Sequence, residues 1–464
     1  MRFIIQVRIE DHDSDGSGDH VVDVGVVERD DLVMGTLGLS INDAKALLAG
    51  VQDTIIAEQC TAALTTAERC ADCGRRFAHK DFRRLVVRSL YGRVNVESPR
   101  WWTCLCAGAT RRSFTPLAVL LPGRSTPELG LVEAKLAAHM SYDATGRLLG
   151  ELFPVGRRID GTEVRRHAYA ISERLDAELA ATGDEAPLEP VPVEVMRALP
   201  VPDMPLVVTI DGGYVHSSEQ TSRTDGWFQA VCGTVTRHDG TVRRFGFVPN
   251  IDDHPRRRIH ELLAAQGMSP NQLVTFLSDG ADDLARWTAR QNPTAEYVLD
   301  WFHITMRFTV LLNTMKSLTD DPDDGDVVGI ADTLRSDVQS AKWHLWHGNL
   351  HRALELLDDT TLGLGACKES DARTKTAKFV SELRGYMRNN RATIPNYAER
   401  HRAGEPISSA TAEATVNTVI AKRMVKHQHM RWTPAGAHHI LQIRTRVLDQ
   451  QLDHDINRWH PAAA

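Results

Sequence analysis

Four cysteines form two close pairs in one short stretch of the chain, Cys70 with Cys73 and Cys104 with Cys106. Two thiolate pairs presented by two tight turns can close a tetrahedron around Zn²⁺. Charged side chains interrupt the opening residues before a signal-peptide core can form, so we expect reduced thiols and not disulfides. The spacing therefore predicts a structural zinc site.

The other three cysteines are weaker candidates as ligands. Cys60 precedes the first pair and could substitute for one of the four. Cys232 and Cys367 lie in stretches typical of a protein core, and we interpret them as structural.

Acidic residues follow two apolar runs in the second half of the chain. Asp211 comes after LVVTI and before two glycines, and Asp279 comes after LVTFLS and before Gly280. Either Asp-Gly pair alone is typical of a turn. If the two runs are adjacent strands of one sheet, the aspartates come close enough to share divalent cations, as a two-metal site requires. The third carboxylate of such a site should come from a helix.

Glu413 is the candidate for that third carboxylate. It lies near the start of an amphipathic segment, where the positive end of a helix stabilises an anion. Glu405 and Glu399 are its nearest rivals, and an exposed capping acid is the bland alternative. Cations that follow Glu413 could hold a phosphodiester against the metals: Lys422, Arg423, Lys426 and Arg431.

Basic residues also surround the cysteine pairs. Residues 69–112 carry 11 Lys or Arg and 3 acids. This density suits phosphate contacts, although a run of charges is more often a solvated face. The candidates for DNA contacts in this stretch are Arg75, Arg76, Lys80, Arg83 and Arg84.

Residues 126–180 have the apolar spacing of three helices joined by short turns. Such a unit suits a helix-turn-helix, whose last helix would present Arg165 and Arg166 to a DNA groove. An ordinary helical bundle that links two domains is the alternative.

The elements that must position the acids follow residue 205. Their predicted order is β-β-β-α-β-α-β, with Asp211, Asp279 and Asp300 at the ends of the first, fourth and fifth strands. This order is RNase H-like, and the pattern from about residue 304 onward is almost wholly helical. We therefore predict an α/β fold in which an RNase H-like catalytic core with a helical insertion follows a zinc ribbon and a small helical domain.

The domain boundaries follow from shifts in composition and pattern. Two strands and a helix capped by Ser40 open the chain. The predicted parts are an acidic α+β segment (1–68), the zinc ribbon (69–125), the helix-turn-helix-like domain (126–182), a proline-rich linker (183–204), the first part of the core (205–318), the helical insertion (319–405) and the C-terminal helices that complete the core (406–464).

The net charge of −7 argues against a simple basic nucleic-acid binder, but the charge is unevenly distributed. Residues 1–68 carry 4 basic and 13 acidic side chains, whereas residues 414–446 carry 6 basic side chains and no acid. This asymmetry indicates a charged partner that is met at particular places. No apolar run approaches the roughly 20 residues of a membrane span, so we expect no membrane association.

The chain resembles the DDE transposases of bacterial insertion sequences, and among them the ISKra-type family of the Mutator-like group. The resemblance rests on CADCG, SPRWWTCLC, TIDGG, LSDGADD, VLDWFHI, KWHLWHG and the long segment that begins EATVNTVIAKRM. It implies a catalytic triad of Asp211, Asp279 and Glu413 that uses Mg²⁺ or Mn²⁺. It also implies an accessory motif, Asp300-x-x-His303.

The same resemblance implies strand cleavage at the terminal inverted repeats of a transposon, followed by transfer of the freed 3′-hydroxyl to target DNA. The partners would be double-stranded DNA and a second copy of the chain, because two transposon ends must be brought together. The expected location is the cytoplasm, at the nucleoid. Members usually have Gly shortly before the glutamate, where this chain has Ala410.

Two other functions remain open at this point. One is a domesticated, non-catalytic DNA-binding protein that uses only the zinc ribbon and the helices. The other is an RNase H-like nuclease that cuts DNA without strand transfer.

Overall fold

The computed structural model divides the 464-residue chain into two compact units, Met1–Ile171 with Gln450–Ala464, and Ser172–Asp449. It describes all residues except 11–18, 107–109, 157–158, 183–191, 201, 203–204, 220–225, 281–286, 289–290, 293, 322–328, 409–413, 426–429 and 462–464.

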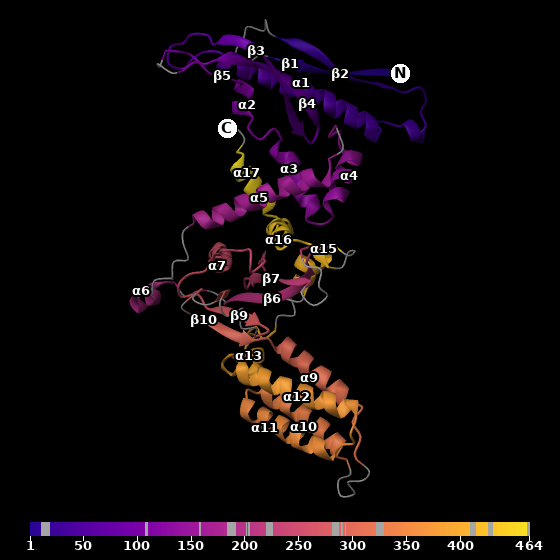
Figure 1. The fold of residues 1–464 in the computed structure, drawn as a ribbon, viewed down its shortest axis with the longest axis vertical. Helices are drawn as coiled ribbons and strands as arrows, with labels where there is room; N and C mark the ends of the chain where they lie inside the picture. The colour runs from indigo at the N-terminus through magenta and orange to yellow at the C-terminus, as the bar shows by residue number, and fades with distance from the viewer. Residues whose placement is uncertain are drawn as a thin grey trace. The chain divides into compact units, whose positions relative to one another are not determined.

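The first unit combines two small sheets with helices (Figure 1). Strands β1 (Arg2–Ile9) and β2 (His20–Glu28) pair antiparallel, and β3 (Ala78–Ser89), β4 (Gly92–Trp102) and β5 (Ser113–Phe114) form an antiparallel sheet in that order. Its described helices are η1 (Met34–Thr36), α1 (Ile41–Ala67), α2 (Pro116–Leu120), α3 (Pro127–Ala137), α4 (Tyr142–Leu152), the first half of α5 (Gly161–Ala181) and α17 (Leu452–Trp459).

Helix α1 begins at the expected cap. The Ser40 hydroxyl accepts a hydrogen bond from the Asp43 backbone N–H, and the Asp43 carboxylate accepts one from the Ser40 N–H. This reciprocal capping box satisfies two backbone donors that a helix N-terminus otherwise leaves unpaired. The predicted helices of residues 126–180 correspond to α3, α4 and α5.

Residues 406–464 were expected to complete the core, but the last helix of this segment lies in the first unit. Helix α17 belongs to the first unit, where it packs on α3 and where Lys135 Nζ lies 2.6 Å from Asp453 Oδ1. Leu452 and Ile456 are buried on this helix. Their burial against the first unit is the physical reason that the chain returns to it.

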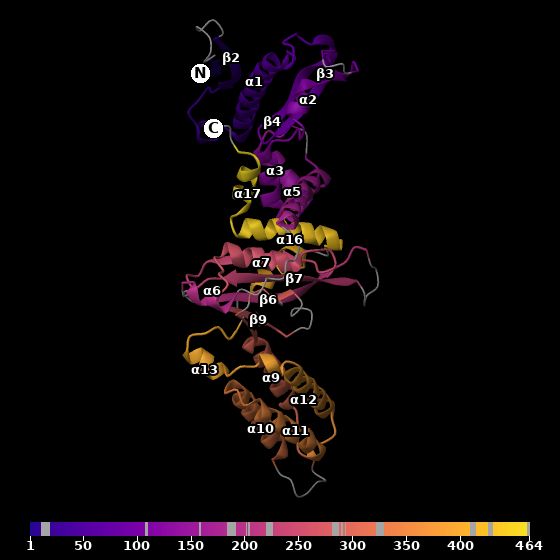
Figure 2. The same ribbon diagram turned by 90° about the vertical axis from the view of Figure 1, so that its left-hand side faces the viewer.

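The second unit contains a five-stranded sheet. Its strands are β6 (Leu206–His216), β7 (Trp227–Thr236), β8 (Val242–Phe247), β9 (Val274–Ser278) and β10 (Ala295–Leu299), in the spatial order β10-β9-β6-β7-β8. Strands β6, β7 and β8 are mutually antiparallel, whereas β9 is parallel to β6 and β10 is parallel to β9. Figure 2 shows α7 and α16 on the opposite side of this sheet from a bundle that includes α9 to α12.

The described helices of the second unit include a short one inside the expected linker, α6 (Val193–Ala198). The others are the second half of α5, α7 (Pro255–Ala265), α9 (Trp301–Met315), α10 (Ile330–Trp346), α11 (Leu350–Gly363), η2 (Leu364–Ala366), α12 (Asp371–Asn389), η3 (Arg391–Thr393), α13 (Tyr397–Arg402), η4 (Val416–Ala421), α15 (Lys422–Met424) and α16 (Pro434–Leu448). Helices α9 to α12 share a core that includes Phe308, Leu334, Leu357 and Leu383, and this core continues into β9 and β10 through Leu277, Val298 and Leu299.

Candidate functional site

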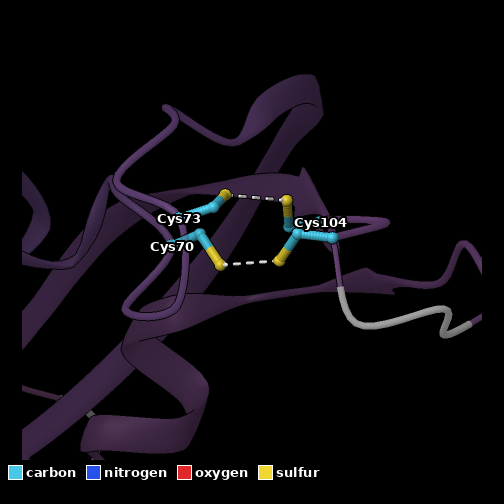
Figure 3. A group of neighbouring side chains, drawn as sticks. Cys70, Cys73 and Cys104 are labelled. Carbon is cyan, nitrogen blue, oxygen red and sulfur yellow. Dashed lines mark hydrogen bonds between the residues drawn. The ribbon is translucent and has the colours of Figure 1, made fainter.

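The two cysteine pairs converge at the end of the β3–β4 hairpin, and their side chains point toward one another (Figure 3). Cys70 Sγ lies 3.6 Å from Cys106 Sγ, and Cys73 Sγ lies 3.4 Å from Cys104 Sγ. All four sulfur atoms lie within 4.8 Å of one another. A tetrahedron with Zn–S bonds of about 2.3 Å places its sulfurs about 3.8 Å apart. The four thiols can therefore hold a metal ion such as zinc.

The backbone preforms the first half of this site. The Gly74 N–H donates to the Cys70 carbonyl at 2.9 Å, and the Cys70 N–H donates to the Arg75 carbonyl at 2.9 Å. Gly74 has φ of +68°, a left-handed conformation that glycine adopts without a Cβ clash. These bonds fold Cys70 and Cys73 onto the same side of one turn, as two ligands of one ion require.

The sulfurs also influence one another electrostatically. The backbone N–H of Cys106 and the neighbouring thiols lower the pKa of Cys104 to about 7, whereas hydrogen bonds with the other thiols raise the pKa of Cys106 to about 12. Neighbouring thiolates repel, so the cluster without a cation favours ionisation of one thiol over ionisation of all four. A bound divalent cation reverses that preference, because it stabilises every thiolate that it contacts.

The remaining cysteines lie outside the cluster. Cys60 is buried in α1 in a core with Leu85 and Val94, and burial raises the pKa of its thiol. It is not among the four converging thiols. Cys232 and Cys367 are fully buried, consistent with their interpretation as core residues.

The predicted basic residues around the cysteines lie on the surface. The side chains of Arg75, Arg76, Lys80, Arg83 and Arg84 are exposed. Some of them already have partners: Arg76 pairs with Glu68 at 2.7 Å, and Lys80 Nζ lies 4.7 Å from the centre of the Trp102 ring. On α5, Arg165 and Arg166 are also exposed.

The three aspartates of the second unit sit where the parallel strands end, with one correction. Asp211 does not end its strand, because β6 continues to His216 through antiparallel pairing with β7. The parallel pairing of β6 with β9 does end before Asp211, at Thr209 opposite Leu277. Asp279 directly follows β9 and Asp300 directly follows β10. All three acids therefore lie toward the carboxyl edge of the parallel strands.

The acids also act on one another. Burial raises the pKa of Asp211, and the charges of Asp279 and Asp300 raise it further, against the opposing effects of the Gly212 N–H and of His303. Like charges close together disfavour ionisation, as burial does, and both effects act on Asp211. Among the described residues, however, the cysteine cluster is the group of three or more ligating side chains whose atoms all come within 4.8 Å. The aspartates thus form a looser arrangement than the thiols.

Asp300 and His303 are neighbours across the first turn of α9. His303 Nε2 lies 3.7 Å from Asp300 Oδ2, and the Asp300 side chain is fully buried. The Asp300 carboxylate also accepts a hydrogen bond of 2.8 Å from the Phe302 N–H, so it caps α9. Asp300 therefore has a structural role that the sequence pattern did not indicate.

The loop that carries Asp279 is held tightly by α12 and the residues after it. The Tyr386 hydroxyl donates to the Asp279 carbonyl at 2.8 Å. Gly280 has φ of +80°, and a Cβ at this position would lie 2.3 Å from Asn390 Oδ1 and 2.7 Å from Leu299 Cδ1. No local sequence pattern marks Tyr386, because its contact joins residues far apart in the chain.

The predicted Glu413 and Lys426 lie outside the described residues. The described chain resumes at 414 and continues into the π-helix η4, which packs on β6 and β7. Val416 and Ile420 of this helix lie 3.2 and 3.3 Å from where a Cβ of Gly213 would stand. The π-helix therefore contacts β6 at Gly213, two residues after Asp211.

A buried arginine supports the π-helix. Arg444 of α16 donates to the carbonyls of Thr418 and Val419 at 3.1 and 2.9 Å. Burial and the nearby charge of Arg423 lower the pKa of Arg444 to about 10. Single π-turns are frequent at functional sites, and here the Arg444 guanidinium donates hydrogen bonds to two carbonyls of that turn.

Of the predicted cations near the π-helix, Arg423 differs from the expectation. It is only 2% exposed, and its guanidinium lies 4.8 Å from the centre of the Trp432 ring. Packing of the stem and guanidinium against Trp432 turns Arg423 into the interior, so it does not face a DNA partner in this structure. Lys422 and Arg431 are exposed.

Comparison with protein-family models and with curated proteins gives no match for this chain. None of the helices in the described part of the chain is both long enough and apolar enough to cross a membrane.

Proposed function

We propose that this protein is a DDE-type DNA transposase with an RNase H-like core. The observation that carries the proposal is the sheet order β10-β9-β6-β7-β8, three antiparallel strands followed by two parallel ones, with an acid at or after each of β6, β9 and β10. In open α/β sheets, functional residues gather at the carboxyl ends of parallel strands. This is the arrangement that the family resemblance leads one to expect.

Asp211 and Asp279 would hold the divalent metal, Mg²⁺ or Mn²⁺, and Glu413 would complete the set. The raised pKa of Asp211 supports this assignment, because a buried carboxylate near two other acids is stabilised when a cation binds. When bound, such ions stabilise the attacking and leaving oxygens of an in-line displacement at phosphorus. Asp300 would add a negative charge near Asp211, and His303, whose charge also acts on Asp211, would orient a phosphate.

The first unit would supply DNA binding. The exposed cations beside the cysteine cluster and on α5 support contacts to phosphates. A metal-bound ribbon would hold the β3–β4 hairpin rigid, so that these cations keep fixed positions. The partners would be the double-stranded transposon ends, the target DNA and a second copy of the chain.

The test is an end-cleavage assay with purified, zinc-loaded protein and labelled duplexes that carry the inverted repeats flanking the gene. With Mg²⁺ or Mn²⁺ we expect nicks at the 3′ ends of the element and joined products. Asp279→Asn should lower the rate by on the order of 1,000-fold. Asp332→Asn is the matched control, because that side chain is 84% exposed on α10 of the same unit.

The outcomes separate the competing functions. Nicks without joined products would favour the nuclease. DNA binding that is unchanged by Asp279→Asn, with no cleavage by the wild type in either metal, would favour the non-catalytic DNA-binding protein.

A further inference from the structure

Helix α1 carries apolar side chains on every side. One side packs Ile56 and Cys60 into the core beneath the β3–β4 sheet. Another lies against the β1–β2 hairpin so closely that a Cβ at Gly50 would stand 2.2 Å from the Val24 carbonyl oxygen. Apolar side chains on a further side of such a helix favour a packing partner there as well.

A third side of α1 carries a stripe of partly exposed apolar side chains. Ile41, Leu48 and Ile55 are 59%, 41% and 42% exposed, and they recur every seven residues. Ala62, also exposed, continues the interval. Side chains seven residues apart lie on one side of a helix, and this repeat is the one found along seams between paired helices. From Ile41 to Ile55 the stripe extends about 21 Å along the helix.

The surface around this stripe is poor in charge. Every residue of α1 is described, and Asp53 is its one charged residue in the exposed class, whereas the partly exposed Lys45 and Glu58 border the stripe with opposite charges. Lys45 Nζ donates to the Gly150 carbonyl at 2.7 Å, and Glu58 pairs with His20 at 3.3 Å, so both bordering charges have partners within the same unit. Interface cores are depleted of charged residues. A strongly basic or acidic partner would find little complementary charge here, whereas an equally neutral apolar surface fits.

An apolar groove of about 430 Å³ lies beside the helix in the same unit, with Phe3, Val27, Leu39 and Leu47 among its lining residues. Leu32 and Met34, in the loop before α1, are 89% and 88% exposed. Leu47, which precedes Leu48 in the chain, is the α1 residue that lines this groove, and exposed apolar surface is typical of interaction sites.

We propose that α1 pairs with α1 of a second copy of this chain along the stripe of Ile41, Leu48 and Ile55. The same stripe on both copies is self-complementary, as a twofold interface requires. Leu48 is the middle residue of the stripe and faces Leu48 of the partner subunit, whether the two helices run parallel or antiparallel. The pairing does not depend on the proposed catalytic activity.

The first test is the mass in solution of the full-length, zinc-loaded protein, measured by light scattering after gel filtration. We expect a dimer for the wild type and a monomer for Leu48→Glu, whose dimer dissociation constant should rise by about 100-fold or more. Leu362→Glu is the matched control, because Leu362 is 80% exposed on α11 and lies outside the stripe. It should remain dimeric, and circular dichroism and zinc content should be unchanged in both variants.

Cross-linking gives a second readout that does not depend on a disruptive substitution. Leu48→Cys should form a disulfide-linked dimer under mild oxidation, whereas the wild type, whose cysteines remain, should not. A monomeric wild type overturns the proposal. So does a folded Leu48→Glu variant that stays dimeric, or a Leu48→Cys variant that does not cross-link. A wild-type monomer that captures another protein through this stripe would assign the surface to a different partner.

Discussion

The cysteine cluster and the group of aspartates show two ways of bringing side chains of one kind together. The four thiols come from two turns at one end of a single hairpin, and all lie within 4.8 Å of one another. The aspartates come from three strands that are joined by long crossovers, and they influence the pKa of Asp211 without forming an equally compact group. Local turns can fix a ligand set by a few backbone hydrogen bonds, whereas a site spread over a sheet depends on every element that sets the strand order.

The largest expected effect breaks the local site. Cys73→Ser should lose the metal and the order of the β3–β5 sheet, because a structural zinc ion contributes an apparent binding free energy of about 10–16 kcal/mol. Atomic emission measures the loss of zinc, and near-ultraviolet circular dichroism measures the loss of order in the sheet. Cys60→Ala is the control: it should keep a full equivalent of zinc, because Cys60 lies in the core and outside the cluster. A Cys73→Ser protein that retains its zinc would show that the four thiols do not form the metal site.

A smaller effect should distinguish the dispersed site. Gly280→Ala should lower the free energy of unfolding of the second unit by about 2–3 kcal/mol, because a side chain is strained at positive φ and would also meet Asn390 and Leu299. Gly240→Ala is matched in φ, at +83°, but has open space around it. It should cost only about 1 kcal/mol. Thermal unfolding and hydrogen exchange of the β10 and α12 amides measure the difference in stability between the two variants. Equal losses of stability would mean that Asn390 and Leu299 do not hold the Asp279 loop.

Asp211→Asn should change the stability in the opposite direction: it should raise the free energy of unfolding of the metal-free protein at pH 7. The pKa of Asp211 is raised above its usual 3.8 by burial and by the neighbouring acids. The Asp211 carboxyl group therefore stabilises the folded protein most at pH values below its pKa in the unfolded chain. This contribution is lost as the pH rises through its higher pKa in the folded protein. Since asparagine does not titrate, the advantage of the variant should appear above about pH 4 in thermal unfolding.

The same experiment tests the cation. Added Mn²⁺ should raise the unfolding temperature of the wild type and leave that of Asp211→Asn unchanged, because a ligand stabilises only a protein that binds it. Asp332→Asn should behave as the wild type at every pH. If Asp211→Asn is less stable than the wild type without metal, the carboxylate has a structural partner and the cation assignment fails.

The smallest expected effect concerns Tyr386. Tyr386→Phe removes the hydrogen bond to the Asp279 carbonyl and should cost about 1 kcal/mol. Tyr214→Phe is the control, because Tyr214 is 66% exposed and its change should leave the unfolding temperature unaltered. If Tyr386→Phe also leaves it unaltered, α12 does not hold the Asp279 loop through this bond.

The sequence predicted features that depend on neighbouring residues better than contacts between distant segments. The cap at Ser40, the helices α3 to α5 and the convergence of the four cysteines depend on nearby residues, and the structure contains all of them. The end of β6 was predicted wrongly, because pairing with β7 carries the strand past Asp211. Arg423 appeared in the sequence as one of several surface cations, and only its packing on Trp432 shows that it is buried.

The sequence by itself determined the features that act over a few residues. The thiol pairs with their left-handed Gly74, the helix caps and the uneven distribution of charge are all properties of short segments, whose conformational choices are limited by local sterics and hydrogen bonds. Tertiary structure decided which distant segments meet: the contact of η4 with β6, the support of that π-helix by Arg444, and the return of α17 to the first unit. Those contacts depend on burial of apolar surface between elements far apart in the chain, and no local pattern specifies the partner.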